Sequence, residues 1–159
     1  MQQKNQSPLT YAQALQKAEA YCAYQERSQY EVRGKLLDLG LRGDDLERII
    51  SELISTNFLN EERFALAYAQ GKMRMKSWGR RKIADGLRFK QVSAPLIKKA
   101  LNSLNGDEYE EKLRQLIEKK GRSMNEKNTK LLNYKLGNYA ISKGYEPDLV
   151  FYILKTKEL

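Results

Sequence analysis

Residues 41–53 read LRGDDLERIISEL, a short turn followed by apolar residues at the spacing of one helix face. The same combination returns as VSAPLIKKALNSL in residues 92–104 and, in shorter form, as YEPDLVFYIL in residues 145–154. The three copies start 51 and 53 residues apart. A repeat of this length is typical of one supersecondary unit used several times, which predicts an all-α chain of small helical units.

The expected starts of the helices carry capping residues and prolines. Thr10 with Gln13, and Ser28 with Glu31, fit the capping box, in which two residues satisfy each other's free backbone amides. Asp44, followed by Glu47, is a near variant of this pattern. All three prolines stand where a helix should begin, a position at which the missing N–H costs nothing: Pro8, Pro95 and Pro147.

The apolar pattern predicts nine helices in three tandem three-helix units, arranged as an elongated or curved array. We expect these units at residues 8–58, 59–105 and 106–159. No segment alternates apolar and polar residues clearly enough to predict a strand.

Two helix boundaries in the later units are expected from local signals. The fourth helix should begin with Glu61 and continue to Met75 on its apolar face, before a break at residues 77–79. A polar loop is expected from Gly121 to Asn128.

The composition is that of a protein with small cores and wide solvated faces. Of the 159 residues, 41% are hydrophobic and 31% charged, and the mean hydropathy is −0.72. No apolar run approaches the roughly 20 residues that a membrane-spanning helix needs. Residues 1–7 are polar and lack the apolar core of a secretory signal, so we expect a cytoplasmic protein.

The residue types exclude several kinds of chemistry. The chain has no histidine, which removes His-based triads, His-based nucleases and the commonest transition-metal ligand. The single cysteine, Cys22, lies at helical spacing with apolar residues and is expected to be buried. Asp44 and Asp45 suit a helix start without any metal, and Gly71-Lys72 lacks the rest of a phosphate-binding loop. We therefore expect no enzymatic activity, metal or cofactor.

Positive charge is concentrated in the middle of the chain. Residues 1–71 hold 8 basic and 10 acidic side chains, whereas residues 72–90 hold 8 basic and one acidic. Residues 98–135 hold 10 basic and 6 acidic side chains, and the whole chain carries a net charge of +9. Such a distribution indicates a polyanion or an acidic protein surface as partner.

We place the candidate partner or DNA interface on the basic segment, residues 72–90. Its helix start at Arg80 offers backbone amides to an anion, and its tryptophan is either a core residue or a platform for a nucleobase. The alternative is that the charged face is only solvated. The segment contributes Lys72, Arg74, Lys76, Trp78, Arg80, Arg81, Lys82, Arg88 and Lys90. A second basic group either extends this surface or forms a soluble loop: Lys119, Lys120, Arg122, Lys127 and Lys130.

Four further motifs are specific beyond their periodicity: Arg27-Ser28, Gly40-Leu41, the junction Phe58-Leu59-Asn60-Glu61-Glu62-Arg63-Phe64-Ala65, and Gly79-x-x-x-Ile83-x-x-x-Leu87. Together they are similar to those of the RecX family of recombination regulators, most strongly over residues 25–104. The third unit matches in its helical outline and in Gly144-Tyr145. The sequence departs from the family at Asn60, where acidic residues usually follow in succession, and at residues 87–92, which read LRFKQV and lack the usual glycine. We therefore expect a tighter or more helical second turn.

The motif residues are expected to maintain the fold. Arg63 should lie on the surface or bridge to Glu61 or Glu62, whereas the apolar residues of the junction should join the core: Phe58, Leu59, Phe64 and Ala65.

The resemblance implies a regulator that binds the RecA recombinase filament on single-stranded DNA and inhibits its ATPase, strand-exchange and coprotease activities. Such a protein serves recombination, DNA repair and the SOS response, and DNA, single- or double-stranded, is a second candidate partner. The residues alone leave open an autonomous helix-turn-helix-like module whose primary ligand is DNA. In either case we expect a monomer that makes no membrane contact.

Overall fold

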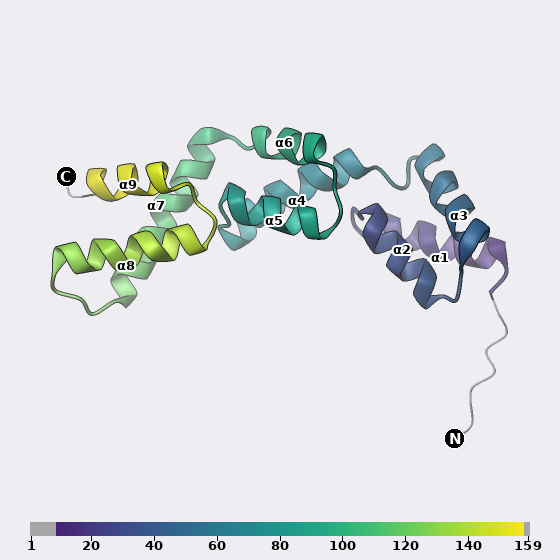
Figure 1. The fold of residues 1–159 in the computed structure, drawn as a ribbon, viewed down its shortest axis with the longest axis horizontal. Helices are drawn as coiled ribbons and strands as arrows, with labels where there is room; N and C mark the ends of the chain where they lie inside the picture. Colours follow the sequence, from purple (N-terminus) through teal and green to yellow (C-terminus); the bar gives the residue numbers. More distant parts are fainter. Residues whose placement is uncertain (1–8, 158–159) are drawn as a thin grey trace, which may run out of the picture. The chain divides into compact units, whose positions relative to one another are not determined.

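The computed structural model describes residues 9–157, and these form nine α-helices and no strand (Figure 1), which confirms the all-α prediction. The helices are α1 (Tyr11–Tyr24), α2 (Gln29–Asp38), α3 (Gly43–Ser55), α4 (Glu61–Lys76), α5 (Arg80–Phe89), α6 (Ala94–Asn102), α7 (Gly106–Ser123), α8 (Thr129–Ser142) and α9 (Pro147–Thr156). None of the helices in this part of the chain has the length and apolar character needed to cross a bilayer.

The described chain divides into two compact units. The first comprises residues up to 64 together with 90–92, and the second comprises residues 65–89 and 93–157. Helices α1, α2 and α3 pack on one another in the first unit. In the second unit α5 packs on α6, and α7, α8 and α9 pack on one another. A finer division into three units, with limits near residues 58 and 105, remains our prediction.

The first two helices begin at the predicted capping boxes. The Thr10 hydroxyl accepts a hydrogen bond from the Gln13 amide at 3.1 Å, and the Gln13 side chain accepts one from the Thr10 amide at 3.0 Å. Ser28 and Glu31 repeat this arrangement at α2, with both bonds 3.1 Å long. Reciprocal capping satisfies amides that have no partner within the helix, and so fixes where each helix starts.

The predicted capping role of Asp44 is wrong. Helix α3 begins at Gly43, after Arg42, and no side chain caps it. Glu47, the residue that would complete a capping box, instead binds Arg33 of α2 in a two-pronged ion pair with an Nη2–Oε2 distance of 3.0 Å. Asp44 lies in the first helical turn, where its negative charge still suits the helix N-terminus.

Other helix limits lie where the sequence predicts them, except that α7 ends later than expected. Pro95 and Pro147 lie in the first turns of α6 and α9, as predicted, whereas Pro8 lies outside the described residues. The expected loop from Gly121 is too long, because α7 continues to Ser123 and only residues 124–128 lack helical structure. Gly121 is tolerated inside the helix because it lies near the end, where fewer backbone bonds depend on it.

The three repeated turns share one backbone conformation. Gly40, Gln91 and Gly144 have φ angles of 91°, 60° and 100°, all in the left-handed region. After the two glycines, the amides of Leu41 and Tyr145 donate to carbonyl groups five residues back, at 3.0 and 3.3 Å, which closes each helix end. The expectation of a tighter or more helical second turn is therefore wrong, because Gln91 adopts the conformation that glycine usually supplies.

The core of the first unit is formed by one face of each of its three helices. Its buried residues are Ala14, Ala18, Cys22, Val32, Leu36, Leu46, Ile49, Ile50, Leu53 and Leu59. Phe58 packs against this core while remaining partly exposed. Cys22 is buried as predicted, and burial raises the pKa of its thiol to about 11. The thiol therefore stays protonated at neutral pH.

The junction before α4 is held by polar side chains. Arg63 donates from Nε to Glu26 at 2.5 Å and from Nη2 to the backbone carbonyl groups of Asn57 and Phe58. Glu61 accepts a hydrogen bond from the Gln29 amide at 2.9 Å, so it caps the start of α2. The expected Arg63–Glu61 bridge is thus replaced by one to Glu26, a residue 37 positions away in sequence.

The core of the second unit begins on α4 and continues to α9. Its buried apolar residues are Ala65, Ala69, Met73, Ile83, Ala84, Leu87, Ile97, Ala100, Leu104, Tyr109, Leu113, Ile117, Leu136, Ala140, Tyr145, Val150, Ile153 and Leu154. Met75, placed on the apolar face by the sequence, is 81% exposed. Met73 takes that role because it follows Ala65 and Ala69 at intervals of four residues, the spacing of one helix face. Phe64, at the end of the first unit, is also buried.

Candidate partner interface

The start of α5 lies against the turn between α8 and α9. The Gly79 amide donates to the Lys143 carbonyl at 2.8 Å, and the Arg81 amide donates to the Gly144 carbonyl at 3.0 Å. A Cβ atom built on Gly79 would lie 2.3 Å from the backbone of both Gly144 and Tyr145. Glycine at this motif position is therefore required by a close approach of two backbones.

Arg80 connects the same helix start to α7 and α9. Its amide donates to the Tyr109 hydroxyl at 3.0 Å, and its guanidinium pairs with Glu146 at 3.0 Å while lying 4.0 Å from the centre of the Tyr109 ring. Tyr109 in turn donates a short hydrogen bond to Glu146. Burial and this bond raise the pKa of the Tyr109 hydroxyl, which stays a donor at neutral pH.

These contacts occupy the amides at the start of α5. The Gly79, Arg80 and Arg81 amides all have acceptors within the second unit. These three amides are therefore not free to bind an external anion. The side chains of Arg81 and Lys82 remain at the surface, Arg81 exposed and Lys82 half-buried.

Half of the basic side chains of residues 72–90 have a carboxylate partner. Arg74 pairs with Glu108 at 2.7 Å, and this bond lowers the pKa of Glu108. Arg88 pairs with Asp85 at 2.8 Å and Arg80 with Glu146. In the first unit, Lys90 lies 3.9 Å from Glu31. The charge of this segment is thus partly compensated within the protein.

Trp78 is not one of the buried core residues of the second unit. Its side chain is half-buried, and the ammonium groups of Lys72 and Lys82 each lie 4.8 Å from the centre of its ring. Cation–π attraction holds the two lysines beside the tryptophan. The stacking of this ring on a nucleobase stays a prediction.

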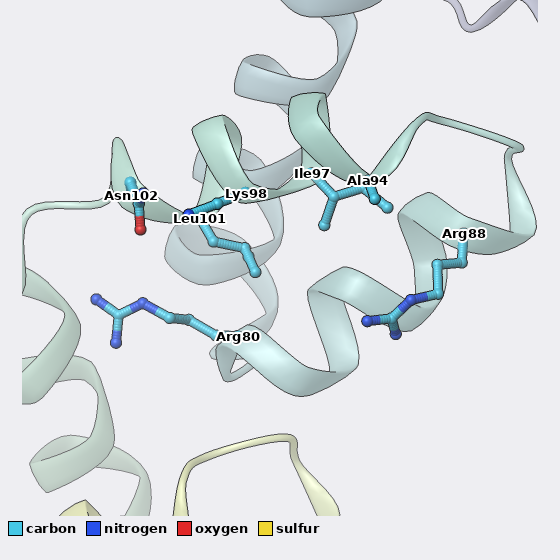
Figure 2. Close-up of a pocket in the computed structure, with 7 residues that line it drawn as sticks. All are labelled: Arg80, Arg88, Ala94, Ile97, Lys98, Leu101 and Asn102. Carbon is cyan, nitrogen blue, oxygen red and sulfur yellow. The ribbon is translucent and has the colours of Figure 1, made fainter.

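A groove runs between α5 and α6 with apolar side chains in the middle and cations around it (Figure 2). Its volume is about 290 Å³, and it is lined by Arg80, Arg88, Ala94, Ile97, Lys98, Leu101 and Asn102. Figure 2 shows Arg80 and Arg88 at the two ends of α5, with Ile97 and Leu101 between them. Sequence reasoning missed Lys98, although its place four residues after Ala94 puts both on one face of α6.

The second basic group lies on and after the last turn of α7. Lys119 and Arg122 are exposed, as are Lys127 and Lys130, whereas Lys120 is half-buried with its ammonium 4.8 Å from the centre of the Tyr139 ring. None of these residues lines the groove between α5 and α6. Whether this group extends the same surface remains open as a prediction.

Among the described residues no group of three or more cysteine and carboxylate side chains is placed to hold a metal ion.

Two models of known protein families match the second and third parts of the chain. The second three-helix domain of RecX matches residues 60–101, and the third three-helix domain of RecX matches residues 107–154. These two segments together cover more than half of the chain.

Curated relatives give the same family, and a solved structure gives the same fold. The regulatory protein RecX of Clostridium tetani is 34% identical over 122 residues, which cover 75% of this chain and 55% of the relative. That of Haemophilus influenzae is 27% identical over 127 residues, 79% of this chain and 82% of the relative. The chain thus spans only about half the length of the clostridial relative. The crystal structure of RecX from Lactobacillus salivarius superposes with a TM-score of 0.82 at 24% identity, covering 92% of this chain and 95% of that one, which supports the fold.

Proposed function

Because the chain belongs to the RecX family of regulatory proteins, we propose that it binds the RecA recombinase filament on single-stranded DNA and inhibits its ATPase, strand-exchange and coprotease activities. In this proposal the protein acts by binding, as a regulator of recombination, DNA repair and the SOS response, and not as an enzyme. Its place of action is the cytoplasm, where the RecA filament assembles on chromosomal DNA.

The groove between α5 and α6 is the observation that carries the proposal. Its apolar lining suits the apolar side chains of a partner segment, and Arg88 and Lys98 suit carboxylates beside them. Arg88 and its partner Asp85 have side chains 64% and 77% exposed. An ion pair so exposed contributes little to stability, so a carboxylate of the partner can replace Asp85 at small cost.

The test is the ATP turnover of RecA on single-stranded DNA, together with co-sedimentation of the protein with RecA filaments. We expect turnover to fall at protein concentrations that leave naked DNA unbound. Lys98→Glu should raise the concentration needed for half inhibition by about fivefold, because it brings a negative charge to the groove. Lys155→Glu, on the exposed face of α9, is the matched control with the same change of charge.

Three outcomes separate the possibilities. Unchanged turnover at saturating wild-type protein refutes the proposed function itself. Equal weakening by Lys98→Glu and Lys155→Glu shows that net charge, and not the groove, controls binding. Weakening by Lys98→Glu alone, with unchanged melting, supports the groove as the contact surface.

DNA as the primary ligand is the second candidate function. It is favoured by Lys76 and Arg81, whose exposed side chains have no ion-pair partner in the part of the chain that the structure describes. Phosphate-driven binding weakens steeply as salt rises. A DNA titration at two salt concentrations therefore decides between the candidates: tight, salt-sensitive binding without RecA favours DNA, and weak binding favours RecA.

A further inference from the structure

A pocket in the first unit combines tyrosine rings with positive charge. It has a volume of about 320 Å³ and is formed by the second half of α1, the connection to α2 and the exposed side of α2. Its lining residues are Lys17, Ala20, Tyr21, Tyr24, Arg27, Lys35 and Leu39. Three of these residues are cations and none is acidic, although residues 1–71 as a whole carry more acidic than basic side chains.

Arg27 is fixed in this pocket without an acidic partner. Its Nε donates to the Tyr21 carbonyl at 3.0 Å, and its guanidinium lies 3.7 Å from the centre of the Tyr21 ring. The Lys35 ammonium lies 5.6 Å from the centre of the same ring. By contrast, Arg33 and Arg63 of the same unit each pair with a glutamate.

Among the described residues, the cations of the pocket form no direct ion pair. In residues 9–157 no carboxylate lies within ion-pair distance of Lys17, Arg27 or Lys35. Cations gathered in this way repel one another unless an anion is present. An arginine held by a ring and a backbone carbonyl also loses little freedom when it binds a phosphate.

Tyr24 supplies a flat apolar surface beside these charges. It is the last residue of α1, its side chain is 83% exposed, and the centre of its ring lies 5.9 Å from the Arg27 guanidinium. A tyrosine so exposed adds almost nothing to the core. Its ring is open to stack on another planar group.

We propose that this pocket binds an unpaired nucleotide of single-stranded DNA, with the base stacked on Tyr24 and the phosphate held by Arg27 and the neighbouring lysines. In a nucleotide, one sugar separates the planar base from the negatively charged phosphate. This arrangement matches the pocket, in which the Tyr24 ring lies beside a cluster of cations. An acidic peptide uses the cations but has no need of the exposed ring. The bases of a duplex are already stacked and cannot reach the ring.

The experiment is a titration of full-length protein into fluorescently labelled oligothymidine, followed by anisotropy and without RecA. Tyr24→Ala should weaken binding by about fivefold or more, because a base stacked on an aromatic side chain contributes roughly 1–3 kcal/mol. Tyr24→Trp should restore binding. Tyr134→Ala is the matched control, because Tyr134 is also highly exposed, at 68%, but lies on α8 in the second unit.

The charge of the pocket is tested separately by Lys35→Gln. This variant should reduce the dependence of binding on salt concentration, whereas Tyr24→Ala should weaken binding with the same salt dependence. Photo-crosslinking with an oligonucleotide that carries 5-iodouracil should attach the DNA to Tyr24 or Tyr21, as located by mass spectrometry.

Three results overturn the inference, two of them in binding and crosslinking to single strands. One is equal affinity of the Tyr24→Ala and Tyr134→Ala proteins for oligothymidine, and the other is crosslinking confined to residues 72–130. Preferential loss of duplex binding in Tyr24→Ala would also contradict it. RecA is absent from all of these experiments. A negative result for the pocket therefore does not contradict the proposed inhibition of RecA, and a failure to inhibit RecA does not contradict the proposed nucleotide site.

Discussion

Alanine at Gly144 should destabilise the second unit far more than alanine at Gly40 destabilises the first. Both glycines have positive φ, 100° and 91°, so alanine at either costs about 1–2 kcal/mol in backbone strain. At Gly40 the added Cβ meets nothing within 4 Å. At Gly144 it would lie 2.5 Å from the Lys82 amide nitrogen and 2.9 Å from the Gly79 carbonyl oxygen. Such crowding adds about 1–3 kcal/mol, which gives a total of about 2–5 kcal/mol.

Guanidinium unfolding measures both changes in the free energy of unfolding. Trp78 is the only tryptophan and belongs to the second unit, so its fluorescence follows that unit, while far-UV circular dichroism follows the helices of both. Gly144→Ala should shift the fluorescence transition to clearly lower denaturant, and Gly40→Ala should shift only part of the dichroism transition. A loss for Gly144→Ala no larger than that for Gly40→Ala would show that the two backbones do not touch.

Three further changes test other features. Gln91→Gly should raise the free energy of unfolding by about 1 kcal/mol, because glycine removes the strain of a φ angle of 60°. Denaturant unfolding measures this gain, and a lower free energy of unfolding would contradict the turn conformation. Tyr145→Phe should be neutral or stabilising by about 1 kcal/mol, since the buried Tyr145 hydroxyl has no hydrogen-bond partner within the described residues; a clear loss in melting temperature would reveal a partner. The free energy of unfolding should fall as pH rises from 9 toward 11. The reason is that the Cys22 thiol has its ordinary pKa of 9.0 in the unfolded chain but a pKa of about 11 when buried, so only the unfolded chain loses the proton in this range. Cys22→Ala should flatten this part of the pH profile of stability.

Local signals predicted most of the fold. The capping boxes at Thr10 and Ser28 and the prolines at 95 and 147 mark helix starts because each acts through backbone atoms a few residues away. Gln91 shows the limit of such reasoning. Its side chain carries no preference for positive φ, so only the repeat itself, with Gly40 and Gly144 at equivalent positions, indicated that a turn lies there.

The sequence predicted where the basic residues of the candidate site lie, but not which acidic residues they pair with. The density of lysine and arginine over residues 72–90 is a property of the sequence, but Arg74–Glu108 and Arg80–Glu146 join residues 34 and 66 positions apart. The apolar lining of the groove was predicted only as helix core, because periodicity cannot tell which side of α6 remains open. Gly79 was recognised as a motif residue, yet its contact with Gly144 leaves no local pattern that a single sequence reveals.

The backbone contact between Gly79 and Gly144 makes the second repeat depend on the third. A peptide cut to residues 59–105 would retain the helices of the second repeat but lose the Lys143 and Gly144 carbonyls and the Tyr109 hydroxyl, leaving the amides that open α5 without acceptors. The repeats are similar in sequence, but the second does not fold independently of the third. The first amides of α5 find their acceptors only after residues 109, 143 and 144 have been synthesised.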